Sequence, residues 1–154
     1  MWKKNLYRTV LAGALAMGCL LTAAGAAQVQ ARGVSMGEIQ QETVDFSQLR
    51  ALDELALPRA AGYLDFSVPA NTIMSASDAF FLDAGDTVTI NCSYSPASAS
   101  MDFGLIDSDG IFYSLNVTGG SINKSIQVSE RGSYTLAIRN NSSSSVRVVG
   151  FVNY

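Results

Sequence analysis

The stretch DTVTINCSYS, residues 86–95, decides the fold class of this chain. Its apolar and polar side chains alternate strictly, and the apolar residues occupy every second position: Val88, Ile90, Cys92 and Tyr94. Because successive side chains of a strand point to opposite faces, the pattern predicts a half-buried β-strand with a defined inner face.

Similar short runs fill residues 62–154, and turns rich in Gly, Asn, Asp and Ser separate them. We expect eight or nine short strands in this region, which together predict an all-β domain built as an antiparallel sandwich or barrel. The marks of an immunoglobulin domain, a cysteine pair and a core tryptophan, are absent after residue 31. The expected strands are 63–68, 71–75, 79–82, 86–95, 101–105, 111–117, 122–128, 134–138 and 146–154.

Residues 1–31 have the organisation of a secretory signal peptide of bacterial type. Three basic residues precede an uncharged run of 18 residues, and a small-x-small motif follows it. We predict cleavage after Ala31, with Ala27 as the alternative site, and therefore a secreted, extracellular or cell-envelope protein. Two other outcomes stay open: an uncleaved membrane anchor, and a lipoprotein cleaved before Cys19.

Removal of 1–31 leaves 7 basic and 13 acidic residues, a formal net charge of −6. An acidic chain with scattered arginines has no electrostatic footprint for nucleic acid or for an anionic membrane surface. Cys92 is then the only cysteine, so no disulfide forms within the chain. Since Cys92 lies on the apolar parity of its strand, we expect a buried and unreactive thiol.

Residues 32–61 are interpreted as a linker with a short helix near 47–57. Ser47 could cap this helix, its leucines recur about every three residues, and Pro58 ends it. Because so short a helix is marginal in water, we expect a partly helical tether that docks its leucine side on the domain. A partner-binding helix is the functional alternative.

Four motifs carry a family resemblance: FSVPA at 66–70, DAGDTVTI at 83–90, DSDG at 107–110 and GSYTLAI at 132–138. In this order they resemble the bacterial pre-peptidase C-terminal type of β-sandwich, which is itself similar to carbohydrate-binding modules. The resemblance covers about 63–154. It implies a jelly-roll-like sandwich, secretion, attachment to polymeric substrates and, in some members, calcium binding. No catalytic domain accompanies the motifs in this chain.

The residue inventory excludes much of the usual catalytic chemistry. The chain has no histidine, so it cannot form Ser-His-Asp or Cys-His catalytic groups or histidine metal sites. No glycine-rich phosphate loop precedes a helix. A pair of carboxylates could still serve a glycosidase, but the acidic residues lie mostly at turns, and we do not expect an enzyme.

Two kinds of binding site remain. Asp107 and Asp109, with Asp102 nearby, could present oxygens to Ca²⁺, the one possible cofactor, although a hairpin turn at 107–110 would also explain Asp107 and Asp109. Phe112 and Tyr63 lie on the opposite parity from their apolar neighbours, so exposed rings could stack on sugars.

The sequence therefore predicts a secreted, non-catalytic β-sandwich module that binds an extracellular or cell-envelope ligand, either carbohydrate or protein. The alternative is a structural or assembly protein whose sheet edges pair with a partner chain.

Overall fold

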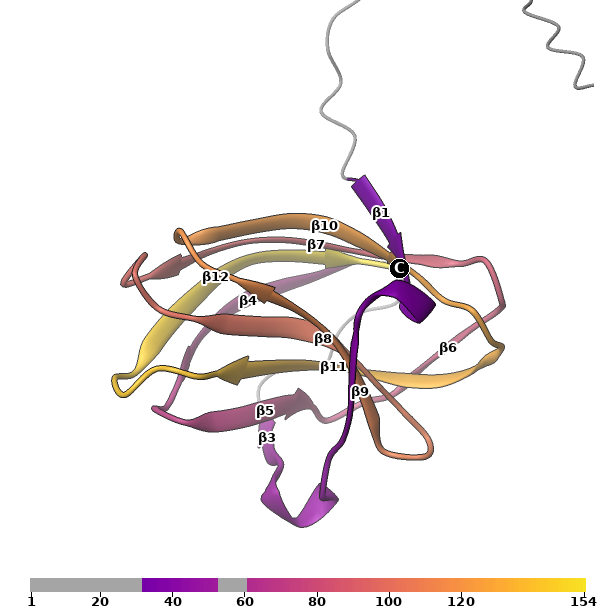
Figure 1. Cartoon of the computed structure of the whole chain (residues 1–154), viewed down its shortest axis with the longest axis horizontal. Helices are drawn as coiled ribbons and strands as arrows, with labels where there is room; N and C mark the ends of the chain where they lie inside the picture. The colour runs from indigo at the N-terminus through magenta and orange to yellow at the C-terminus, as the bar shows by residue number, and fades with distance from the viewer. Residues whose placement is uncertain (1–31, 53–60) are drawn as a thin grey trace, which may run out of the picture.

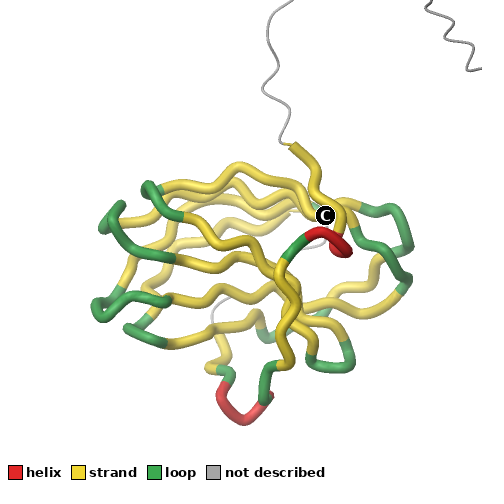
Figure 2. The backbone as a smooth tube through the Cα atoms, viewed as in Figure 1, coloured by secondary structure: helices red, strands yellow, loops and turns green. Residues whose placement is uncertain are grey.

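The computed structural model describes residues 32–52 and 61–154, and β-strands make up most of this part of the chain. Its helical elements are two single turns, η1 (Met36–Glu38) and η2 (Phe46–Gln48), shown in red in Figure 2. The strands are β1 (Arg32–Ser35), β2 (Gln40–Thr43), β3 (Arg50–Leu52), β4 (Ala61–Val68), β5 (Thr72–Ala76), β6 (Phe80–Leu82), β7 (Thr87–Ser95), β8 (Met101–Asp107), β9 (Ile111–Val117), β10 (Ser121–Gln127), β11 (Gly132–Asn140) and β12 (Val146–Asn153).

The strands form two sheets that enclose one core (Figure 1). The five-stranded sheet has the order β1-β10-β7-β12-β4, and the seven-stranded sheet has the order β2-β9-β8-β11-β5-β3 with β6 also paired to β11. The predicted all-β sandwich is confirmed. The nine strands β4–β12 of residues 61–154 agree with the eight or nine expected.

Eight strands of five residues or more, β4, β5 and β7–β12, carry the topology. Within this set the first strand pairs with the last (β4 with β12), the second with the seventh (β5 with β11), the third with the sixth (β7 with β10) and the fourth with the fifth (β8 with β9). This nested antiparallel pairing is the wrapped arrangement of a jelly roll. The jelly-roll-like architecture is confirmed.

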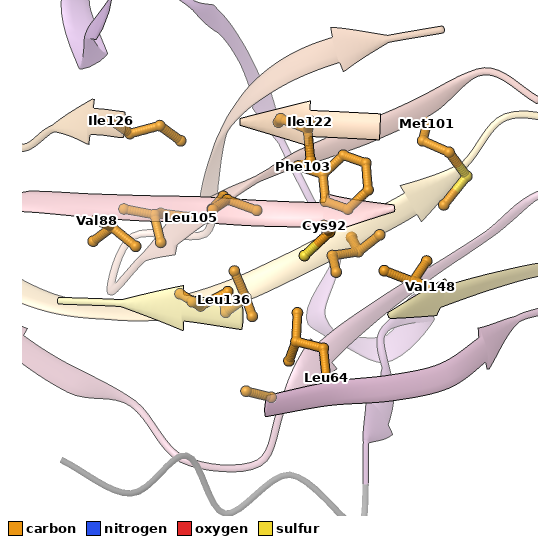
Figure 3. Packing of buried hydrophobic residues seen from close by; sticks show 14 of the residues in the cluster. Leu64, Val88, Cys92, Met101, Phe103, Leu105, Ile122, Ile126, Leu136 and Val148 are labelled. Carbon is orange, nitrogen blue, oxygen red and sulfur yellow. The ribbon is translucent and has the colours of Figure 1, made fainter. Parts of the chain in front are cut away.

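Strand β7 shows the predicted alternation. Val88 and Ile90 are fully buried, and Cys92 and Tyr94 are nearly so, while the residues between them face outward. Figure 3 shows Val88 and Cys92 among side chains from both sheets, including Phe103, Leu105 and Leu136. Because burial removes apolar surface from water, this single core supplies the main stabilisation of the domain.

Residues 32–52, which we call the strap, are part of the sandwich rather than the predicted linker. In the strap, β1 pairs parallel with β10, β2 antiparallel with β9, and β3 parallel with β5. Figure 1 shows this indigo to purple segment running from β1 past β9 to β3. The strap therefore extends both sheets, and the pairs β1–β10 and β3–β5 depart from the otherwise antiparallel scheme.

The predicted helix near 47–57 is replaced, where the structure describes it, by η2 and β3. Asp45, not Ser47, is the cap: its carboxylate accepts the Ser47 N–H at 2.9 Å. Pairing with β5 satisfies the backbone of Arg50–Leu52, which a marginal helix would have to satisfy alone. Residues 53–57 lie outside the described part of the chain.

No helix within 32–52 or 61–154 combines the length and the apolar character that a membrane span needs. Residues 1–31, with the predicted signal peptide and Cys19, lie outside the described residues. Their interpretation stays a prediction.

Candidate functional site

Phe112 is fully buried, so its predicted role as an exposed sugar platform is wrong. It lies on the outer face of the seven-stranded sheet, where the strap covers it. Val44 of the strap, Ile106 and Ala137 form a second apolar cluster with Phe112, and Leu49 packs against this cluster. The off-parity position of Phe112 therefore indicates a second layer that covers this face and not a ligand site. Leu49, one of the leucines expected to dock on the domain, packs against this cluster from the end of η2 and not from the predicted helix.

Asp102 is also buried, on the same outer face. Its carboxylate accepts hydrogen bonds from Arg139 Nε at 2.8 Å, Asn116 Nδ2 at 2.6 Å and Asn141 Nδ2 at 2.9 Å. Arg139 also reaches Glu42 of the strap at 2.6 Å. The Asp102 oxygens are therefore occupied by protein donors and help to fasten the strap to the sheet.

Asp107 organises the β8–β9 hairpin. One carboxylate oxygen accepts the N–H groups of Asp109 and Ile111 at 3.0 and 2.9 Å, and the other accepts the hydroxyl of Tyr113 at 3.0 Å. Gly110 closes the turn at φ 80°, a left-handed conformation that glycine adopts without strain. The interpretation of Asp107 and Asp109 as residues of a hairpin turn is confirmed, whereas Asp102 lies within β8.

The three aspartates do not form the predicted calcium site. Asp102 and Asp107 are five residues apart on β8, so they project from opposite faces of the sheet. Among the residues described, no three Asp, Glu, Cys or His side chains converge as a metal site would require.

Tyr63, in contrast, lies where a ligand could reach it. Its side chain is 55% exposed on the outer face of the five-stranded sheet. Directly opposite on β12 stands Phe151, which is 53% exposed. The two ring centroids are 5.2 Å apart with the planes tilted by 56°. An exposed aromatic pair of this kind is a local departure from an otherwise polar surface.

The strand register extends this pair into a row across four strands. Phe151 lies opposite Asn91 of β7, and Asn91 lies opposite Asn123 of β10. Both asparagines are exposed. With strands about 4.8 Å apart, the row Asn123–Asn91–Phe151–Tyr63 spans about 14 Å at the backbone.

The surface around this row carries almost no free charge. The outward positions of β7 are Thr, Thr, Asn, Ser and Ser, and those of β10 are Ser, Asn, Ser and Gln. The two charged outward residues on β4 and β12, Asp65 and Arg147, pair with each other through two hydrogen bonds of 3.0 Å. The hydrogen bond to Arg147 lowers the pKa of Asp65, and the same bond raises the pKa of Arg147.

We call the row and its flanking pair the aromatic–amide face. Aromatic rings can cover the apolar C–H face of a sugar, while asparagine amides both donate to and accept from hydroxyl groups. Because their planes are tilted by 56°, the two rings do not form one flat platform.

Sequence reasoning identified Tyr63 but missed Phe151, Asn91 and Asn123. Phe151 had a usable signal, because it falls on the opposite parity from Val148 and Val152 in the last strand. Asn91 was already assigned to the outer face of its strand. Their alignment with Tyr63 depends on the pairing of strands far apart in the chain, which no local pattern encodes.

Comparison with models of protein families, with curated proteins and with solved structures finds no match to this chain. The resemblance to the pre-peptidase C-terminal sandwich therefore stays a prediction.

Proposed function

We propose that this protein is a secreted, non-catalytic module that binds a neutral polysaccharide of the extracellular space or cell envelope through the aromatic–amide face. The observation that carries the proposal is the continuous row of two exposed aromatic rings and two exposed amides across β10, β7, β12 and β4. Export, predicted from residues 1–31, would bring the domain to such polymers.

The charge distribution favours a neutral ligand. The Asp65 carboxylate and the Arg147 guanidinium pair with each other at 3.0 Å, so together they add no net charge to this face. The remaining outward side chains on these strands offer hydroxyl and amide groups, which match the hydroxyl groups of an uncharged glycan.

Retention on insoluble neutral polysaccharides, followed by titration with soluble oligosaccharides, tests the proposal. We expect saturable binding that the double variant Tyr63→Ala/Phe151→Ala loses and that Asn91→Ala weakens. Phe81→Ala is the matched control, since Phe81 is 59% exposed but belongs to the other sheet. Binding that survives in the double variant, or that Phe81→Ala abolishes equally, would contradict the proposal.

A second candidate is a structural or assembly protein that pairs through a sheet edge. It is favoured by β4, an eight-residue strand that ends the five-stranded sheet in the described part of the chain. Long edge strands are templates for pairing with another chain. Light scattering separates the two functions: assembly predicts a mass that rises with protein concentration without added polysaccharide, whereas a binding module keeps a constant mass.

A further inference from the structure

A cavity of about 250 Å³ lies where the strap, the β8–β9 hairpin and the β10–β11 connection meet. A water molecule in liquid takes about 30 Å³, so the cavity has room for a small organic group. It belongs to a different part of the sandwich from the aromatic–amide face and shares no residue with it. Its lining consists of Met36, Gly37, Gln41, Asp107, Tyr113, Ser129, Glu130 and Tyr134.

The polar groups of the lining are mostly arranged to accept hydrogen bonds. The Tyr113 hydroxyl donates its proton to Asp107 at 3.0 Å, and the Tyr134 hydroxyl donates to the backbone oxygen of Glu130 at 2.7 Å. Gln41 donates through Nε2 to the backbone oxygen of Met36 at 3.4 Å. Each phenol hydroxyl therefore already donates its one proton within the protein, so towards a ligand it can only accept a hydrogen bond. The carboxylates likewise can only accept.

The electrostatic character of the lining is negative. It contains two carboxylates, Asp107 and Glu130, and neither a lysine nor an arginine. Burial and then the negative charges of Asp107 and Glu130 raise the pKa of Tyr134. Burial, followed by the hydrogen bond and charge of Asp107, raises the pKa of Tyr113 to about 12. Both phenols thus experience the field that a bound cation would also experience.

We propose that this cavity binds a primary alkylammonium group. Such a group brings three N–H donors to walls that can accept them and a positive charge to a lining that holds two negative ones. Its alkyl stem would lie against Met36 and the two tyrosine rings, whose faces also attract cations. Since Met36, Gly37 and Gln41 belong to the strap, the bound ligand would also hold the strap against β9 and β11.

The test is a titration of the wild-type chain with n-butylammonium chloride, observed through the ring signals of Tyr113 and Tyr134 by NMR. Uncharged n-butanol and sodium butyrate, each at matched ionic strength, are the ligand controls. We expect saturable shifts with butylammonium only, which weaken as salt is added because screening reduces the attraction. Equal shifts with butanol, or no saturation with butylammonium, would overturn the proposal.

Two variants separate the cavity from the rest of the surface. Glu130→Gln keeps the shape of an exposed side chain and removes its charge, and we expect affinity for butylammonium to fall about tenfold. Asp65→Asn removes a carboxylate on the aromatic–amide face and should leave the affinity unchanged. If both variants weaken binding equally, the amine responds to the net charge of the protein and not to this cavity.

Discussion

The two outer faces of the sandwich differ in whether solvent reaches them. The outer face of the five-stranded sheet is bare, and it carries hydroxyls, amides and the exposed Tyr63–Phe151 pair. The outer face of the seven-stranded sheet is covered by the strap, and Ile106, Phe112 and Ala137 are buried beneath Val44. Aromatic residues at off-parity positions therefore mean different things on the two sheets: Tyr63 is available to a ligand, whereas Phe112 anchors the strap.

The burial patterns of single strands show the same contrast. On β7 buried and outward positions alternate, as expected for a sheet with one face in water. On β8 six consecutive residues are buried, because its second face lies under a further layer. Alternation along a strand thus identifies the inner face, but whether the outer face is buried depends on whether another segment covers it.

The largest expected effect on stability comes from a substitution on the covered face, beneath the strap. Phe112→Ala should lower the free energy of unfolding by about 3–5 kcal/mol, because it opens a cavity beneath the strap and removes the ring that Arg139 faces at 5.5 Å. Phe151→Ala on the bare face should cost less than about 1 kcal/mol. Urea denaturation of both variants measures the difference, and equal losses would mean that the two faces are not distinct.

The next effect concerns the polar fastening of the strap. Asp102→Ala should cost about 2–3 kcal/mol, since Arg139, Asn116 and Asn141 lose their shared acceptor and Arg139 is only partly open to solvent. Thermal unfolding with and without Ca²⁺ measures the cost and its origin. We expect the wild-type transition to be insensitive to Ca²⁺ and to chelator, whereas a calcium-dependent shift that Asp102→Ala abolishes would restore the metal interpretation.

The inner face of β7 gives an effect that is absent at neutral pH and grows only above about pH 9. Burial raises the pKa of Cys92 from its ordinary 9.0 to about 12. Above about pH 9 the unfolded thiol loses its proton while the native thiol keeps it, so the contribution is complete below pH 9 and is lost as the pH rises towards 12. The loss is about 1.4 kcal/mol per pH unit in this window.

Alkaline denaturation of the wild type and of Cys92→Ala, each measured from pH 8 to pH 11, isolates this slope. We expect the variant, although less stable at pH 8, to lose less stability with rising pH. Thiol labelling supplies the comparison of faces: native Cys92 should react slowly, while a cysteine at the exposed neighbouring position, in Ser93→Cys, should react quickly. Rapid labelling of native Cys92 would mean that the inner and outer faces of β7 are reversed.

The strands of 61–154 could be predicted from the sequence because their signals are local. Residues 111–117 alternate between two turns and form β9 with the same bounds, and Asp107 and Gly110 specify the hairpin before it. The strap could not be predicted in this way. Its strands are three or four residues long, and β1 and β3 acquire their conformation by pairing with distant strands.

The candidate site was predictable only in part for the same reason. The parity of Tyr63 indicates an outward ring, and the parity of Phe112 gives the same indication, yet the structure buries one and exposes the other. Ile106 and Ala137 are also apolar at outward positions of neighbouring strands, and the three together could have indicated a covered face. No single strand contains that information, because it resides in the lateral order of the sheet.

The smallest effect on stability is expected at Tyr94, which is buried on the inner face of the sheet whose outer face carries the exposed Tyr63. In the described part of the chain, the buried Tyr94 hydroxyl lacks a hydrogen-bond partner. Because an unpaired buried hydroxyl carries a desolvation cost, Tyr94→Phe should raise the free energy of unfolding by up to about 1 kcal/mol. Tyr63→Phe is the control, since an exposed hydroxyl remains hydrated in both states and its loss should change stability by less than about 0.5 kcal/mol. Urea denaturation of the two variants measures both changes. If Tyr94→Phe is less stable than the wild type, the Tyr94 hydroxyl makes a hydrogen bond to a bound water in the core, and the prediction is wrong.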